Sequence, residues 1–122
     1  MRQVYVKHIS KKYAVAGDAY IEDDPIPPGK VITYHRAAAY FAELTSSEYI
    51  NWYIKNGGQR LWIGDDKPGT TGGPAQRDLQ LTLGEGMSLG CYSANITTDE
   101  VFHFVATGCL SDLESWRMIV GD

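Results

Sequence analysis

The sequence predicts an all-β protein: a two-sheet antiparallel β-sandwich, jelly-roll-like, with about eight strands. Apolar and polar residues alternate with a period of two through most of the 122 residues, as in strands with one buried face. β-Branched and aromatic residues are frequent in these segments, and turn-forming residues separate them. A parallel sheet would require strand patterns that alternate with helix patterns, and the sequence has no such alternation. The length suits a single domain over residues 1–122.

Three strands are predicted in the first part of the chain, up to residue 41. One begins at residue 4 and runs to residue 10, and a short one follows at residues 19–21. Residues 22–29 interrupt the pattern, because three prolines remove amide donors and restrict the residues before them. A long strand is expected over residues 30–41, although the three alanines at its centre favour a helix by propensity.

The clearest unit is a hairpin over residues 49–64. Its two apolar segments flank Asn56-Gly57-Gly58, which supplies the positive-φ residues that tight hairpin turns require. Alternation gives the hairpin two faces. One is apolar and is expected to face the core; it carries Ile50, Trp52, Ile54, Leu61 and Ile63. The other is polar but carries two aromatic residues, Tyr53 and Trp62.

A glycine- and proline-rich segment, residues 65–78, is expected to form a long surface loop. Three strands are predicted after it, at residues 79–83, 88–93 and 101–107. Ten apolar side chains are expected in the core: Trp52, Ile54, Leu61, Ile63, Leu79, Leu81, Leu83, Leu89, Phe102 and Phe104.

The tail, residues 110–122, could form a C-terminal arm. Ser111 and Glu114 have the spacing of a capping box, which predicts a short helix. A final edge strand is the alternative.

Composition narrows the class of protein. Hydrophobic residues make up 43% and charged residues 21%, which argues against intrinsic disorder. The net charge of −4 and the scattered basic residues argue against a nucleic-acid partner. No apolar run approaches the roughly 18–20 residues of a membrane-spanning helix, so no membrane partner is expected. The first residues lack the pattern of a signal peptide, which predicts synthesis in a cytoplasm.

Cys91 and Cys109 are expected to be free and largely buried thiols, since a leaderless chain implies a reducing compartment. If their strands form a hairpin, Cys91 faces His103 and Cys109 lies well beyond it. Neither cysteine has the flanking positive charge of an activated thiolate.

Residues that could carry chemistry do not form a recognisable catalytic or metal-binding pattern. His8, His35 and His103 are isolated on separate predicted strands, whereas metal-binding histidines in small β-barrels come as closely spaced pairs. Asp23-Asp24 and Asp65-Asp66 lack the spacing of a calcium loop, and turn hydrogen bonds explain them. We therefore expect no enzyme activity, no cofactor and no metal. A small β-barrel metalloenzyme that uses the three histidines remains the alternative.

The candidate binding residues are Tyr53 and Trp62, on the hairpin face opposite its core residues. Exposed aromatic rings on a sheet can stack on sugar rings or anchor a protein interface. The competing interpretation is that both hairpin faces are covered, one by the opposing sheet and the other by a loop.

Three segments together resemble small jelly-roll structural proteins of tailed bacteriophages, especially capsid decoration, or cement, proteins. They are Ile26-Pro27-Pro28-Gly29-Lys30-Val31, the strand–turn–strand unit from Leu79 through Gly84-Glu85-Gly86 to Leu89, and Val101 to Gly108. Those proteins have a Pro-x-Gly strand start, a later Leu-x-Glu-Gly turn and a last strand that ends in Val-x-Gly. The similarity covers residues 26–108, and its motifs also occur in unrelated sandwiches.

The resemblance implies a viral structural protein on the capsid surface of a phage head, made in the host cytoplasm. Its partners would be the major capsid protein and further copies of itself, as a homodimer or homotrimer. The alternative function is a carbohydrate- or receptor-binding sandwich, for instance on a tail fibre, that uses Tyr53, Trp62 and the loop at residues 65–78.

Overall fold

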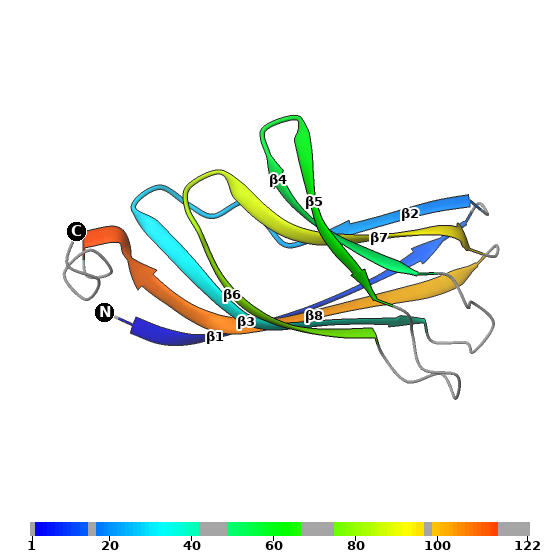
Figure 1. Cartoon of the computed structure of the whole chain (residues 1–122), viewed down its shortest axis with the longest axis horizontal. Coiled ribbons are helices and arrows are strands. Elements are labelled where there is room, and N and C mark those ends of the chain that lie inside the picture. Colours follow the sequence, from blue (N-terminus) through cyan, green and yellow to red (C-terminus); the bar gives the residue numbers. More distant parts are fainter. Residues whose placement is uncertain (1, 15–16, 42–48, 67–74, 97–98, 115–122) are drawn as a thin grey trace.

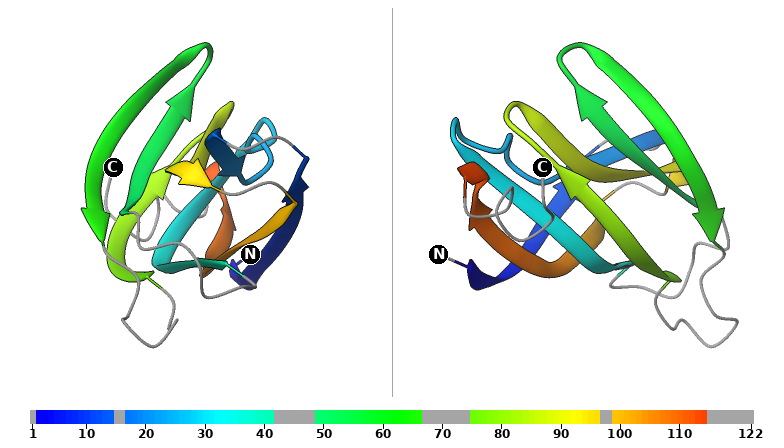
Figure 2. Two further views of the ribbon diagram at one scale, coloured as in Figure 1. Left: turned by 90° about the vertical axis from the view of Figure 1, so that its right-hand side faces the viewer. Right: turned by 60° about the vertical axis from the view of Figure 1, so that its left-hand side comes forward.

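The computed structural model describes residues 2–14, 17–41, 49–66, 75–96 and 99–114. Eight strands form two antiparallel sheets of four that pack as a sandwich, as predicted (Figures 1 and 2). The strands are β1 (Arg2–Tyr13), β2 (Gly17–Glu22), β3 (Lys30–Phe41), β4 (Ile50–Asn56), β5 (Gln59–Asp66), β6 (Ala75–Leu83), β7 (Met87–Ile96) and β8 (Glu100–Asp112). No helix in the described part of the chain is long and apolar enough to cross a membrane.

The strand order is that of a jelly roll. One sheet has the order β1-β8-β3-β6 and the other β2-β7-β4-β5. Four of the ladders pair the first strand with the last, the second with the second last, and so on inward: β1–β8, β2–β7, β3–β6 and β4–β5. The chain is therefore one long antiparallel ribbon, closed by the hairpin of β4 and β5 and wrapped on itself.

Several predicted boundaries change. The predicted loop at residues 65–78 is wrong at both ends, because β5 extends to Asp66 and β6 begins at Ala75, and residues 67–74 lie outside the described residues. The run of three alanines is strand: Ala37 and Ala39 are fully buried in the core, so packing overrides their helical propensity. Of the tail, residues 110–112 belong to β8, a central strand paired with β1 and β3, and residues 115–122 lie outside the described residues.

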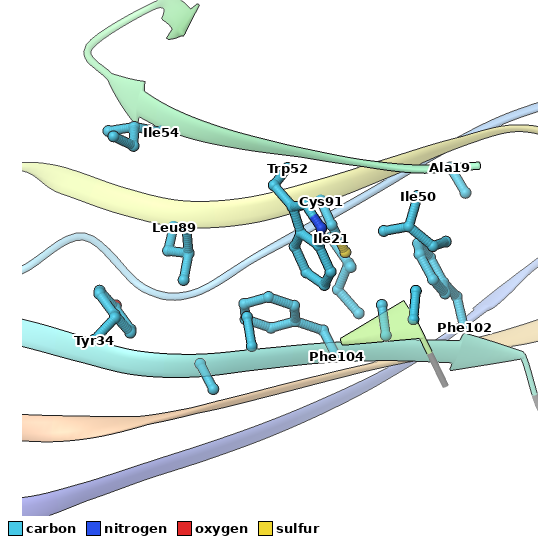
Figure 3. Close-up of a cluster of buried hydrophobic side chains, with 14 of the residues drawn as sticks. Ala19, Ile21, Tyr34, Ile50, Trp52, Ile54, Leu89, Cys91, Phe102 and Phe104 are labelled. Carbon is cyan, nitrogen blue, oxygen red and sulfur yellow. The ribbon is translucent and has the colours of Figure 1, made fainter. Parts of the chain in front are cut away.

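The core lies between the sheets, and Figure 3 shows its central side chains. Six of the ten predicted core residues are buried: Trp52, Ile54, Leu83, Leu89, Phe102 and Phe104. Ile63, Leu79 and Leu81 are partly buried against this core. The prediction for Leu61 is wrong, since its side chain is 65% exposed. It lies on the β4–β5 hairpin, whose tip rises away from the opposing sheet (Figure 1).

Both cysteines are free, as predicted. Cys91 is fully buried in β7, and burial raises the pKa of its thiol well above the usual value. Cys109 is only partly buried. The expected hairpin around them does not exist, because β7 and β8 belong to different sheets, and Cys91 pairs with Ile21 and Trp52.

The break before β3 is held by backbone hydrogen bonds rather than by a strand. The Ile26 amide donates to the Met87 carbonyl at 3.1 Å, and the Gly86 amide donates to the Ile26 carbonyl at 2.9 Å. Ile26 is buried, so the proline-rich segment follows the turn before β7 and inserts one side chain into the core. The two motifs of the resemblance, the proline–glycine start and the Glu–Gly turn, are thus neighbours in space.

Candidate functional site

Four aromatic rings gather on the outer face of the β2-β7-β4-β5 sheet, one from each strand. We call them the aromatic cluster: Tyr20 in β2, Tyr92 in β7, Tyr53 in β4 and Trp62 in β5. The register places Tyr20 opposite Tyr92 and Tyr53 opposite Trp62. Alternation along each strand points these side chains away from the core.

Each ring of the aromatic cluster contacts two others. Ring centroids are 4.7 Å apart for Tyr20 and Tyr92, 5.8 Å for Tyr92 and Trp62, 5.3 Å for Trp62 and Tyr53, and 6.2 Å for Tyr53 and Tyr20. Three of these pairs meet edge to face, with interplanar angles between 67° and 69°. Such pairs stabilise a structure by about 0.5–1.5 kcal/mol each beyond burial, so the cluster is a rigid platform.

Tyr53 is the buried member of the cluster, which corrects the prediction that it belongs to a surface patch. Its side chain has no exposed area, because the Arg60 guanidinium lies over its ring at 5.2 Å and over Tyr20 at 4.1 Å. On the sheet side it rests on Gly90, where a Cβ atom would approach the Tyr53 Cζ to 2.7 Å. Its hydroxyl donates to Glu22 at 3.2 Å, and burial raises the pKa of Tyr53.

Trp62 is the exposed member, as predicted, with half of its surface accessible. Beside it lies a shallow groove of about 510 Å³, lined by Asn51, Trp62, Gly64, Asp65 and Tyr92. We call it the aromatic groove. Its walls are two aromatic rings, and its polar groups are an amide and a carboxylate, a combination that is common in ligand sites.

A β-bulge builds the groove. The β4–β5 register shifts between Trp52 and Tyr53, and Gly64 has a φ of 145°. The extra residue changes the alternation of β5, so that Trp62 and Asp65 both line the groove. The Arg77 Nη1 atom lies 2.0 Å from where a Gly64 Cβ atom would be, so a side chain at this position would have to displace the Arg77 guanidinium.

The expected turn hydrogen bond is present at Asp23, whereas Asp24 and Asp66 have side-chain partners far apart in sequence, and Asp65 and Asp66 lie in β5 rather than in a loop. Asp23 accepts the Asp24 amide at 2.7 Å, and Asp24 pairs with Lys7 at 2.9 Å. Asp66 accepts hydrogen bonds from the Trp52 indole at 2.7 Å and the Arg77 Nε at 2.8 Å. Of the four carboxylates, Asp65 lines the aromatic groove.

The histidines are not isolated, which corrects the prediction. His8 and His103 lie on the paired strands β1 and β8, and their Nε2 and Nδ1 atoms are 3.2 Å apart. Burial and the charge of His8 lower the pKa of His103. His35 is elsewhere, with its Nε2 atom 3.6 Å from the Cys109 Sγ. In the described ranges, no group of three or more His, Cys, Asp or Glu residues is placed to hold a metal ion.

Sequence reasoning missed Tyr92 and Asn51, which line the aromatic groove beside Trp62, and Tyr20, which completes the aromatic cluster. All three alternate with buried residues in their strands, which indicates an outward direction. The missing information was the strand order, because β2, β7 and β4 are adjacent only in the folded chain.

Comparisons with known proteins give a similar shape only. No protein family matches the sequence, and no curated protein does. A chain of infectious bursal disease virus, Gt strain, matches 89% of this chain at 12% identity and a TM-score of 0.37, and this chain spans 31% of its length. The virus-like particle of Macrobrachium rosenbergii extra small virus matches 84% of this chain and 79% of its own at 10% identity and a TM-score of 0.32.

A further match is the exo-β-1,3-galactanase of Phanerochaete chrysosporium. It covers 84% of this chain and 29% of the enzyme at 19% identity, with a TM-score of 0.34. Matches at this level assign no function to the chain.

Proposed function

We propose that this protein is a non-catalytic structural protein of a virion that decorates a capsid and binds its outer surface through protein–protein contacts. The observation that carries the proposal is the strand order, since jelly rolls of eight strands are a recurrent fold of viral capsid domains and lectins. The resemblance to decoration proteins supports the same role. Its three segments lie at the start of β3, around the β6–β7 turn and in β8.

The contact surface in this proposal is the exposed side of the β4–β5 hairpin. Trp62 is half exposed there and its ring contacts Tyr92, while Arg60, two residues earlier on β5, lies over Tyr20. Tryptophan, tyrosine and arginine are the residues most enriched in the energetic centres of protein interfaces. The rings are held by one another, so little side-chain entropy is lost when a partner covers them.

Two experiments test the role. Mass spectrometry of virions from the natural source should detect this chain in stoichiometric amounts, and virions without it would overturn the proposal. Recombinant protein should then cosediment with particles that lack it, and Trp62→Ala should weaken this binding. The control is a Val4→Ser/Val6→Ser double variant, since these residues are 83% and 63% exposed but lie on β1. Loss of binding in the control alone would move the contact surface to β1.

The aromatic groove favours a second candidate, carbohydrate binding. Sugar rings present apolar faces that stack on aromatic side chains and hydroxyl groups that need hydrogen-bond partners. The groove offers Trp62 and Tyr92 for stacking, and the Asn51 amide and Asp65 carboxylate as partners. Because Asp65 carries a negative charge, a neutral sugar fits the groove better than an acidic one.

A glycan array followed by tryptophan fluorescence titration separates the two candidates. Trp62→Ala should weaken sugar binding by about 1–3 kcal/mol, by analogy with base stacking. Leu61→Ala is the matched control, because it removes an exposed apolar side chain from the other face of the same strand. An array without hits, together with unchanged fluorescence, rejects carbohydrate binding and leaves the protein-contact proposal in place.

A further inference from the structure

A second constellation lies on the opposite side of the molecule, on the outer face of the β1-β8-β3-β6 sheet. The His8 Nε2 and His103 Nδ1 atoms are 3.2 Å apart. The Ser10 Oγ atom lies 2.7 Å from His103 Nδ1 and 3.3 Å from His8 Nε2. Three potential donor atoms therefore converge on one small region of the surface.

The separation of the two nitrogens suits a shared metal ion. Zinc binds imidazole nitrogens at about 2.0–2.1 Å, so two of them at a tetrahedral angle are about 3.3 Å apart. The 3.2 Å between His8 and His103 is close to that value. In the neutral form each imidazole can hold its proton on the other ring nitrogen, which leaves the facing nitrogen free to coordinate.

The surroundings hold the pair in place. Tyr40 stacks on the His103 ring, with centroids 4.5 Å apart and an interplanar angle of 10°. The His8 ring is 5.4 Å from the same ring. The β1–β8 ladder places Ser10 opposite His103, so the register of two paired strands fixes the relative position of the donors. A fixed donor geometry lowers the entropy lost on binding.

We propose that His8 and His103 bind one first-row transition-metal ion of the Zn²⁺ type on this face. Imidazole ligands select such ions, whereas Ca²⁺ and Mg²⁺ require oxygen ligands. His8 and Ser10 are exposed, so water can complete the coordination, and the Ser10 hydroxyl can hold such a water. The proposal departs from the expectation of no metal, and it is independent of the proposed function.

The test is calorimetric titration with Zn²⁺ alone, in a Cys109→Ser background that removes the thiol near His35. We expect one Zn²⁺ per chain with micromolar affinity and a thermal transition that rises with the Zn²⁺ concentration. His8→Ala and His103→Ala should each weaken binding about tenfold or more. His35→Ala is the matched control, because it removes an exposed imidazole of the same sheet, and it should leave binding unchanged.

Three results would overturn the proposal: no heat and no thermal shift in the background protein, binding that survives both His8→Ala and His103→Ala, or binding lost in His35→Ala. Far-UV circular dichroism of each variant checks that the sandwich is intact. A conservative His8→Asn variant gives a second measurement. It keeps a polar side chain at this exposed position but lacks the imidazole, so its Zn²⁺ binding should also be weakened.

Discussion

The sandwich has two long edges, and each is closed by a different kind of polar contact. At the β1–β2 edge, the buried Asp23 accepts the Tyr5 hydroxyl at 2.6 Å and the Tyr34 hydroxyl at 2.8 Å. Tyr5 and Tyr34 belong to the β1-β8-β3-β6 sheet, whereas Asp23 follows β2 of the other sheet, so the two hydrogen bonds tie the sheets together. Burial and the hydrogen bond to Asp23 raise the pKa of Tyr5, and burial and the charge of Asp23 raise that of Tyr34.

At the β5–β6 edge, Arg77 of β6 joins the sheets. Its guanidinium donates to Asp66 at 2.8 Å, to the Ile63 carbonyl at 3.2 Å and to the Asp65 carbonyl at 3.1 Å. The side chains of Arg77 and Asp66 are each 30% exposed, whereas Asp23 is 1% exposed. Water can replace a lost contact at this edge but not at the first one, so the loss of a hydrogen bond should reduce stability more at the β1–β2 edge than at the β5–β6 edge.

Asp23→Ala should have the largest effect. It leaves the hydroxyls of Tyr5 and Tyr34 without their shared acceptor, and Tyr34 is fully buried. We expect a loss of about 3–5 kcal/mol in the free energy of unfolding, measured by urea denaturation. Asp24→Ala is the control: its side chain is 81% exposed and pairs with Lys7, so the loss should stay below about 1 kcal/mol. Equal losses in both variants would contradict the comparison.

Gly64→Ala should have the second largest effect on stability, at the β5–β6 edge. A Cβ atom there would lie 2.0 Å from the Arg77 Nη1 atom, and the φ of 145° disfavours any side chain. We expect a loss of about 2–3 kcal/mol in urea denaturation, because the guanidinium must move or the bulge must straighten. Gly84→Ala should be nearly neutral in the same assay, since a Cβ atom added at Gly84 would have no other atom within 4 Å.

Arg77→Lys should have a smaller effect, about 1–2 kcal/mol, because lysine keeps the charge but cannot reach three acceptors in a fixed plane. Urea denaturation at low and high salt measures it. The exposed pair of Arg36 and Asp78, with side chains 58% and 79% exposed, provides the control variant Arg36→Lys. If Arg36→Lys lowers the free energy of unfolding as much as Arg77→Lys does, the contacts of Arg77 at the β5–β6 edge are equivalent to an ordinary surface ion pair.

The smallest effect on stability is expected away from both edges, at the ion pair of Lys30 and Asp112. The hydrogen bond from Lys30 lowers the pKa of Asp112 from 3.8 to about 2. The folded chain therefore favours the charged carboxylate, and the resulting stability is present above pH 3.8 and lost as the pH falls toward 2. Thermal midpoints of the natural chain and Asp112→Asn should differ slightly at neutral pH and converge near pH 2. A constant difference across this range would contradict the assignment.

The fold was predictable because its signal is local. Alternation in β6 and β8 and the turn glycines of the β4–β5 hairpin each depend on a few neighbouring residues. The exposure of Trp62 followed from the same alternation. Ala37 and Ala39 show the limit of propensity, since their burial against the opposing sheet decides their conformation.

The sites depended on contacts that the sequence does not reveal. His8 and His103 are 95 residues apart and meet because β1 pairs with β8. Tyr53 is buried because Arg60 covers it and Gly90 leaves room beneath it. Leu61 is exposed because the tip of the β4–β5 hairpin extends away from the opposing sheet, although the alternation of apolar and polar residues in β5 predicts a core position for Leu61.

The ribbon topology has a kinetic consequence. β8 lies between β1 and β3, yet it is the last of the eight strands to leave the ribosome. Until then β1 has no partner in its sheet, and its exposed Val4 and Val6 can pair with other chains. Sandwiches dominated by such distant pairings fold on the order of milliseconds to seconds. During synthesis, the yield of this protein should therefore depend on chaperones that shield β1.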